Sequence, residues 1–449
     1  MLKAIIVYAL AVSMMCTGVF MPVSSSEGIF YEAEYPESVS MPDQMDYISD
    51  DGNLDFDAYY EDYNRWAEAS RGKMLSNGEA DSLSQYFCDI SQEILAREDK
   101  KNKVLSPVNV YLALSMLAEI TDGTTRSEIL KLLNAESAEQ LRKQANRVFL
   151  SVYENDGQTT SIPASSVWLR DDIEYKKDAL RILSKEYFAS SFSGKMGAPE
   201  YDQKIQKWLS DATRGLLSEQ AENITFDPET IIALATSLYF KAGWNSVFDI
   251  TLTKKDVFHG VSGDEEAEFM HKGGTDTYYW SDNFGAVALP LTNGGSMWFI
   301  LPDEGVAPEK LFEEGKILSL VQKPYEWADR KNLIVNKFVP KFDVTGENDL
   351  IESLRNLGIE AAFNSDRSDF TPLTDIDEIV VSKAQHDARV KIDEQGVEAA
   401  AYTVIMAMAT SARPPEDKMD FVVDRPFAFV ITSRDGLALF AGVVNETGK

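Results

Sequence analysis

One segment near the C-terminus constrains this chain more than any other, because it suits two different environments. It reads Glu394-Gln395-Gly396-Val397-Glu398-Ala399-Ala400-Ala401, continues as an apolar run from Tyr402 to Ala412, and is closed by Pro414-Pro415-Glu416. A glycine hinge, small residues and a strand-like run fit either a loop in solvent or a strand in a sheet. A chain with two environments for one segment stores free energy that a protease cut would release.

The residues of this segment alternate as a strand in the middle of a sheet requires. One parity holds small or β-branched residues: Val397, Ala399, Ala401, Thr403 and Ile405. The other parity carries the charge and the largest ring: Glu398, Ala400, Tyr402, Val404 and Met406. No proline lies between Val397 and Ala412 to remove a ladder donor. We therefore expect the first set to face a core when the segment is paired.

Charge and composition limit the partners of the chain. It has 449 residues, of which 44% are hydrophobic, enough for one large domain with a sizeable core. The formal net charge of −30 argues against binding to nucleic acid, to heparin-like polyanions and to anionic membrane surfaces.

Residues 1–25 have the pattern of a secretory signal peptide. Lys3 supplies the positive start, Ala4 to Met21 the apolar stretch, and Val23-Ser24-Ser25 a small-residue cleavage site. This predicts a secreted or extracellular protein. The apolar stretch is also just long enough to span a bilayer, so an uncleaved anchor that tethers the protein to the cell surface stays an alternative. Removal of the signal leaves Cys88 as the lone cysteine, which excludes an internal disulfide.

Residues 26–75 are strongly acidic. Between Ser26 and Ser70 there are thirteen Asp or Glu and one basic residue, Arg65. Such a segment repels itself and buries little surface, which favours an extended linker. Its nine aromatic residues are many for a solvated tail, so docking on a partner or on the domain is the alternative. They are Phe30, Tyr31, Tyr35, Tyr47, Phe56, Tyr59, Tyr60, Tyr63 and Trp66.

Residues 76–449 form the globular part, in which helical patterns come early and strand patterns late. This order predicts an α+β fold with large antiparallel sheets. Helices are expected over Ser82–Glu98, from Ser106-Pro107 and over Asp349–Leu357, and strands over Ile231–Phe240, Gly285–Pro302, Leu333–Val344 and Phe421–Asn445.

The common catalytic motifs are absent from the sequence. It contains no Gly-x-Ser-x-Gly elbow, no His-Glu-x-x-His, no Cys-x-x-Cys pair and no phosphate-binding Gly-x-x-x-x-Gly-Lys loop. His259, His271 and His386 are the only histidines, and structural roles are expected for them. The chain is therefore predicted not to be an enzyme and to need neither metal nor cofactor.

Nine short motifs, in order from about Leu75 to the end, resemble those of the serpin family of protease inhibitors. They are Asn102-Lys103-Val104-Leu105-Ser106-Pro107, Asp122-Gly123-Thr124-Thr125, Tyr239-Phe240-Lys241 with Trp244, Val257-Phe258-His259, Phe269-Met270, Val339-Pro340-Lys341-Phe342, Leu354-x-x-Leu357-Gly358-Ile359, Arg425-Pro426-Phe427 and Leu439-Phe440-Ala441-Gly442.

The resemblance implies a fold of three sheets with eight or nine helices and an exposed reactive loop between Glu394 and about Pro414. It also implies a monomeric suicide inhibitor. A target serine protease would cut the loop and form an acyl bond to it, and the cut loop would then enter the central sheet and trap the protease. The permissive hinge (Glu394, Gly396, Val397, Glu398, Ala399, Ala400 and Ala401) favours inhibition. The alternatives are a non-inhibitory carrier and an inhibitor of a cysteine protease.

Counting along the loop predicts the bond that is cut. Sixteen positions after Glu394, by the spacing of the family, lies Thr410, which makes Thr410-Ser411 the expected bond. Counting back from the prolines gives Ser411-Ala412, and Met408-Ala409 is a third choice. All three present a small or unbranched uncharged side chain, which favours elastase-like or subtilisin-like proteases over trypsin-like ones.

The resemblance also implies a polar cluster that controls opening of the central sheet. His386 falls at the position of the histidine of the family and Ser106 at one of its serines. Asn109 and Thr236 depart from the usual serine and asparagine, and Trp244 lies below the central strand. Because buried polar groups need partners, His386 is expected to hydrogen-bond Ser106, Asn109 or Thr236.

Overall fold

The computed structural model describes residues 29–49, 52–397 and 417–448. The signal-like segment, the loop beyond Val397 and all of the candidate cleavage bonds therefore lie outside the described residues. No helix in the described ranges is long and apolar enough to cross a membrane.

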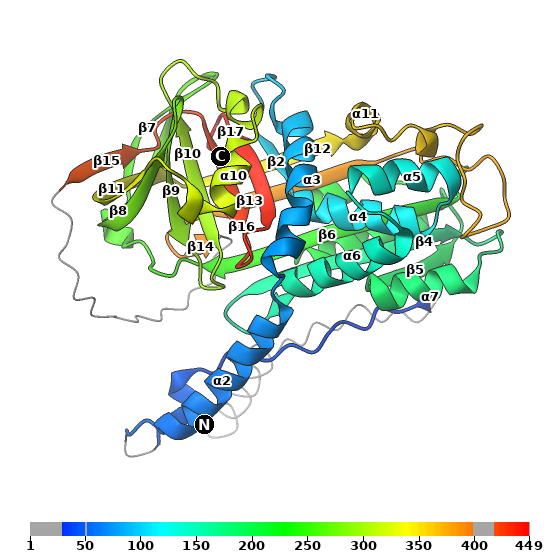
Figure 1. Cartoon of the computed structure of the whole chain (residues 1–449), viewed down its shortest axis with the longest axis horizontal. Helices are drawn as coiled ribbons and strands as arrows, with labels where there is room; N and C mark the ends of the chain where they lie inside the picture. The colour runs from blue at the N-terminus through cyan, green and yellow to red at the C-terminus, as the bar shows by residue number, and fades with distance from the viewer. Residues whose placement is uncertain (1–28, 50–51, 398–416, 449) are drawn as a thin grey trace.

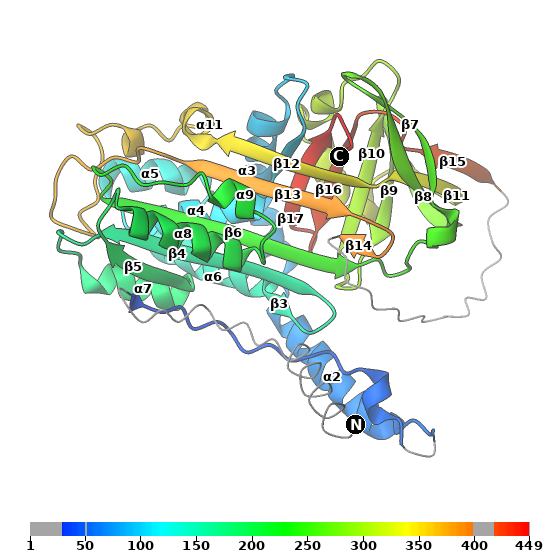
Figure 2. The ribbon, with the colours of Figure 1, turned by 180° about the vertical axis from the view of Figure 1, so that it is seen from behind.

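The described strands form two sheets (Figures 1 and 2). In spatial order, the eight-stranded first sheet contains β1 (Ile29–Tyr31), β5 (Ala189–Gly194), β4 (Thr160–Arg170), β6 (Ile232–Gly243), β14 (Gly396–Val397), β13 (Gln385–Ile392) and β12 (Phe342–Asp349), with β3 (Glu154–Asn155) beside β4. The nine-stranded second sheet contains β15 (Lys418–Val422), β11 (Arg330–Pro340), β8 (Gly263–Trp280), β9 (Phe284–Pro290), β10 (Ser296–Pro302), β16 (Phe427–Thr432), β17 (Ala438–Val444) and β2 (Lys103–Leu105), with β7 (Lys254–Gly260) beside β8.

Ten α-helices lie within the described ranges. They are α2 (Phe56–Lys73), α3 (Asn77–Leu95), α4 (Pro107–Glu119), α5 (Gly123–Leu132), α6 (Ala138–Val152), α7 (Lys177–Glu186), α8 (Pro199–Ala212), α9 (Ser218–Ala221), α10 (Lys316–Gln322) and α11 (Leu350–Asn356). Helices α4 to α7 cover one face of the first sheet, and α8 and α9 lie on the other (Figures 1 and 2).

The α+β class is confirmed, and one detail of the sheets differs from the expectation of three. Strand β8 is 18 residues long and pairs with β7 and β11 along most of its length. At its end it also pairs with β9, through Tyr278 and Val287. This single strand therefore joins two smaller sheets into one continuous sheet.

Local sequence signals account for several element boundaries. Ser76 and Glu79 form a reciprocal capping box that starts α3. Asp349 caps α11, and Gly358, at φ +93°, follows its end. The strand expected over Leu333–Val344 is two strands, because the chain passes at Lys341 from the second sheet to the first.

The acidic N-terminal segment is not the extended linker that its charge predicts. β1 pairs antiparallel with β5 and forms the edge of the first sheet, and the backbone N–H of Ala33 donates to the Ser190 hydroxyl at 3.1 Å. Helix α2 follows, with Tyr59 and Trp66 buried. The alternative, docking on the domain, describes this segment better, since apolar rings at intervals of three and four residues stabilise a helix despite the acidic charge.

Candidate functional site

The first sheet is incomplete in its middle. β14 has only two residues, and they pair with β6 on one side (Gly396 with Gly243, Val397 with Ala242) and with β13 on the other (Val397 with Ile392). Beyond β14, no described strand pairs with the facing edges of β6 and β13. Figure 2 shows β14 at one end of these two long strands. Among the described residues, only the two of β14 therefore lie between β6 and β13.

A tight turn before β14 fixes the hinge. The backbone N–H of Gln395 donates to the Asp393 carboxylate at 2.8 Å. Trp244 holds the turn twice, since its backbone N–H donates to the Gln395 carbonyl at 2.9 Å and its indole N–H to the Asp393 carbonyl at 2.8 Å. Trp244 is buried just after the end of β6, so its two hydrogen bonds tie the hinge turn to the central strand.

Glu394 is buried and fully engaged in this turn. Its Oε1 lies 2.8 Å from the Lys341 ammonium and accepts a hydrogen bond from the Thr253 hydroxyl at 2.8 Å. Burial raises the pKa of Glu394, but the hydrogen bonds from Lys341, from its own backbone and from Thr253 outweigh burial and lower it overall. Burial opposes the charge of Lys341 as well, and its bonds to Glu394 and Glu268 raise its pKa overall.

Gly396 is required for close packing. A Cβ at this position would lie 2.3 Å from the Ala242 carbonyl oxygen of β6. The sequence suggested a flexible hinge, whereas the structure shows that absence of a side chain lets the turn approach the central strand. Val397 follows and is buried in the main core. Glu398, Ala399, Ala400 and Ala401 lie outside the described residues.

The expected hydrogen bond to His386 is present, with an unexpected donor. The backbone N–H of Ser106 donates to Nε2 of His386 at 2.9 Å, while the Ser106 hydroxyl donates to the Leu439 carbonyl at 2.6 Å. Ser106 begins α4 without capping it, because its hydroxyl is used in this way. Burial lowers the pKa of His386 to about 4, so the ring is neutral at pH 7 and accepts at Nε2.

The structure brings together three of the five residues expected to control opening. Ser106, Asn109 and His386 line one small cavity between β6 and β13. Thr236 and Trp244 do not line this cavity. Trp244, eight residues after Thr236, contacts the hinge turn instead. Among the described residues, no hydrogen bond joins His386 to Asn109 or Thr236, and the buried Asn109 Oδ1 accepts no hydrogen bond.

Sequence reasoning missed three contributors to this site. Lys341 was noted only as part of a motif, and Thr253 carried no signal. Arg389, on β13, binds both carboxylate oxygens of Asp343 on β12 at 2.7 Å and donates to the Leu216 carbonyl beyond α8. Arg389 thereby links the segment after α8 to β13, one of the two strands that flank β14. These partners lie far apart in sequence, so no local pattern could reveal them.

Comparison with known proteins decides the family. A family model described as serpin (serine protease inhibitor) matches residues 81–447. The chain belongs to the serpin family. Serpins are typically protease inhibitors. Serpin-ZX of Arabidopsis thaliana is 30% identical over 363 residues, covering 76% of this chain and 91% of that protein. Serpin-Z1C of Triticum aestivum is 31% identical over 363 residues, covering 77% and 90%.

Solved serpin structures show the same fold. Native tengpin, a thermophilic serpin, has a TM-score of 0.73 at 25% identity and covers 83% of this chain and 95% of its own. The Arabidopsis protein AtSerpin1, in a native stressed conformation, has a TM-score of 0.70 at 26% identity, with 82% and 98% covered. A thyroxine-binding globulin in complex with thyroxine also shares the fold, at 23% identity and a TM-score of 0.68.

Proposed function

We propose that this serpin is a secreted suicide inhibitor of elastase-like or subtilisin-like serine proteases. The incomplete first sheet carries the proposal. After cleavage near Thr410-Ser411, the segment beyond Val397 would continue β14 between β6 and β13. The severed loop would thereby become a central strand and carry the acyl-bound protease with it.

The register of β14 shows how many loop residues would fit between β6 and β13. Extending the pairing of Gly396 with Gly243 and Val397 with Ala242 brings Ala407 level with Ile232, the first residue of β6. Ten residues, 398–407, therefore span the strand. At ~0.5–1.5 kcal/mol for each hydrogen bond, plus apolar burial, their insertion supplies on the order of 10 kcal/mol. That is enough to make insertion effectively irreversible.

The same register predicts the face that each loop residue takes. Leu238, Phe240 and Ala242 of β6 face the main core, as do Ala388 and Val390 of β13. Directly paired residues share a face. Ala399, Ala401, Thr403 and Ile405 would therefore join Val397 on the core side, as their alternation in the sequence predicts.

Two side chains of the loop find specific partners in this register. Thr403 would lie level with Thr236 on β6 and His386 on β13. Glu398, on the opposite face, would lie between Lys241 and Lys391. The carboxylate would lie between two ammonium groups and the hydroxyl beside a buried histidine. Both placements support insertion of the cleaved loop as a strand of this sheet.

Covalent trapping is the direct test. The protein is mixed with an elastase-like protease, with trypsin, and with the same elastase inactivated at its catalytic serine. We expect a complex stable in hot detergent with active elastase alone, and a released peptide that begins near Ser411. Loop-cleaved protein should unfold at a higher temperature than intact protein. A carrier would give neither result, and an inhibitor of cysteine proteases would trap only those enzymes.

A further inference from the structure

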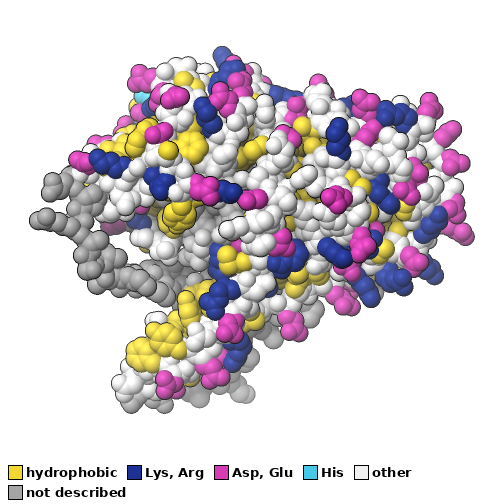
Figure 3. Space-filling model, in the orientation of Figure 1, with side chains coloured by type: hydrophobic (Ala, Val, Ile, Leu, Met, Phe, Trp, Pro, Cys, Tyr) yellow, Lys and Arg dark blue, Asp and Glu magenta, His cyan; other side chains and the backbone are white. Residues whose placement is uncertain are grey.

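Apolar side chains gather in solvent at the free end of α2. Met45, Ile48, Phe56 and Tyr60, here called the aromatic tip, are 69%, 42%, 60% and 55% exposed. Figure 3 shows apolar side chains gathered on the part of the molecule that projects away from the domain, where Figure 1 places α2. Exposed apolar clusters with a polar rim are typical of protein interaction surfaces.

The aromatic tip is held in one arrangement. Asp55 caps α2 by accepting from the backbone N–H of Ala58 at 3.1 Å. The Tyr47 hydroxyl donates to Asp62 at 2.6 Å and thereby ties the preceding turn to the helix. Phe56 and Tyr60 stack, with ring centroids 6.5 Å apart. Rigid aromatic rings lose little entropy on binding, which suits them to anchor a partner.

The charge around the aromatic tip selects the partner. Residues 43–64 contain eight Asp or Glu and no Lys or Arg. A second copy of this chain would bring the same acidic surface and a net charge of −30, so self-association is opposed. Anionic lipid is opposed for the same reason. The complementary partner is a cationic protein surface with an apolar pocket.

A series of contacts links the base of α2 to the hinge. The Trp66 indole N–H donates to Asp156 at 3.0 Å, and the other oxygen of Asp156 accepts from the backbone N–H of Thr159 at 2.8 Å. The Thr159 hydroxyl lies 3.4 Å from that of Thr292, whose backbone N–H donates to the Gly243 carbonyl. Gly243 pairs with Gly396 of the hinge. A short path of contacts therefore joins α2 to the start of the reactive loop.

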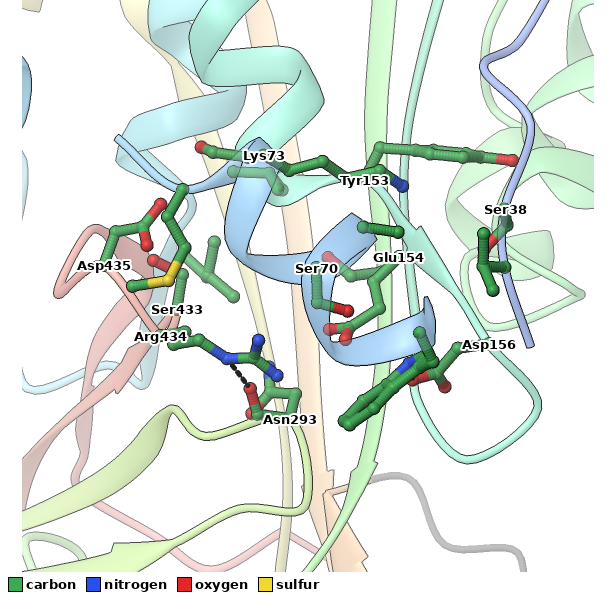
Figure 4. Close-up of a pocket in the computed structure, with 18 residues that line it drawn as sticks. Ser38, Ser70, Lys73, Tyr153, Glu154, Asp156, Asn293, Ser433, Arg434 and Asp435 are labelled. Carbon is green, nitrogen blue, oxygen red and sulfur yellow. Dashed lines mark hydrogen bonds between the residues drawn. The ribbon is translucent and has the colours of Figure 1, made fainter. Parts of the chain in front are cut away.

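A second contact fixes the base of α2. Arg434 packs over the Trp66 ring, 5.9 Å from its centroid, and donates to the Asn293 carbonyl at 3.0 Å. Figure 4 shows Arg434, Asn293 and Asp156 around one small polar cavity of about 40 Å³ against α2. With 18 residues, α2 extends ~27 Å, so its free end lies well out from the domain, where a docked protein can contact it.

We propose that the aromatic tip is a second contact surface for the target protease, which binds it through a cationic, apolar-lined patch outside its active site. The inference rests on the proposed inhibitory function. The tip would raise the rate at which the protease meets the loop and would leave the trapping step unchanged.

Rates of complex formation with two proteases test this. One is a cationic elastase, and the other is an anionic elastase of the same primary specificity. Phe56→Ser with Tyr60→Ser removes the anchors, and Asp46→Asn, Asp57→Asn and Glu61→Gln remove three charges. The matched controls, Ile376→Ser with Val380→Ser and Asp366→Asn, Asp375→Asn and Asp377→Asn, lie before the start of β13, whereas the hinge follows its end. Circular dichroism checks that α2 remains folded.

We expect both tip variants to slow the cationic elastase about tenfold. The charge variant should also weaken the salt dependence of the rate, which the apolar variant should leave in place because it keeps every carboxylate. The anionic elastase, the control variants and the number of inhibitor molecules used per trapped protease should be unaffected. Equal slowing by tip and control variants would overturn the inference, as would a dimer that Phe56→Ser dissociates. If no protease is trapped at all, the proposed function itself fails. If trapping persists at tip-independent rates, only this inference fails.

Discussion

The carboxylate of Glu394 lies 2.8 Å from the ammonium of Lys341, a residue at the point where the chain passes from one sheet to the other. Both side chains are largely shielded from water, at 6% and 26% exposure. The pair fixes the turn before β14 against the crossing between β11 and β12.

Removing the Lys341 ammonium should destabilise the intact protein by about 3 kcal/mol, because Glu394 would remain buried with less compensation. Lys341→Met is the variant, measured by denaturant unfolding. Lys331→Met is the control, since its pair with Asp417 is exposed and contributes less than about 1 kcal/mol. Equal effects of the two substitutions would contradict the assignment.

The same pair predicts a pH dependence. The pKa of Glu394 is lower in the folded than in the unfolded chain. Its contribution to stability is therefore complete above the unfolded pKa, about 4.3, and is lost as pH falls through the folded value. Glu394→Gln should flatten the acid side of the stability profile. An unchanged profile would show that Glu394 gains nothing from its partners.

The pKa of His386 predicts a second pH range over which the stability of the protein changes. Its pKa is about 4 in the folded protein, against about 6.5 when unfolded. The unfolded chain binds the extra proton between these values, so stability is complete above about pH 6.5 and falls progressively toward pH 4. His386→Ala should remove this slope, lower the melting temperature and speed conversion to a latent form. Unchanged melting and inhibition would remove His386 from the control of opening.

Adjacent loop residues should respond oppositely to arginine. Thr403→Arg would place a charge on the core face beside His386, and loop entry should become too slow to trap the protease. Tyr402→Arg would place it on the other face, level with Asp387 on β13. On gels, we expect Thr403→Arg to give cleaved inhibitor and free protease. Tyr402→Arg should give the covalent complex. Equal trapping by both would refute the register.

Glu398 should stabilise the protein only after the loop has been cleaved. Between Lys241 and Lys391 its carboxylate would contribute roughly 0.2–1 kcal/mol for each exposed pair. Glu398→Gln should lower the melting temperature of the cleaved form and leave that of the intact form unchanged. A double-mutant cycle with Lys391→Ala measures the coupling, and zero coupling would place Glu398 elsewhere.

Local sequence pattern predicted what depends on neighbouring residues. The α+β class, the helix over Asp349–Leu357 and the strands over Gly285–Pro302 are confirmed, because caps, turns and alternation act over a few positions. The pair of Lys341 with Glu394 was invisible, since its two members are brought together only by the fold.

The N-terminal segment shows where charge misled. Its acidity indicated an extended linker, yet Tyr59, Tyr63 and Trp66 recur at helical spacing and Asp55 stands at the cap position. That signal was present in the sequence. What no pattern could supply was the partner of Trp66, the Asp156 carboxylate ninety positions later.

The two paired residues of β14 have a kinetic consequence. Adding a strand to a sheet is slowest at its first rungs, where the ends must be brought together before bonds compensate the lost entropy. Here Gly396 already pairs with β6, and Val397 pairs with both β6 and β13. Nucleation is complete before any protease arrives, so once the peptide bond is cut, zipping of the remaining rungs competes directly with hydrolysis of the acyl-enzyme.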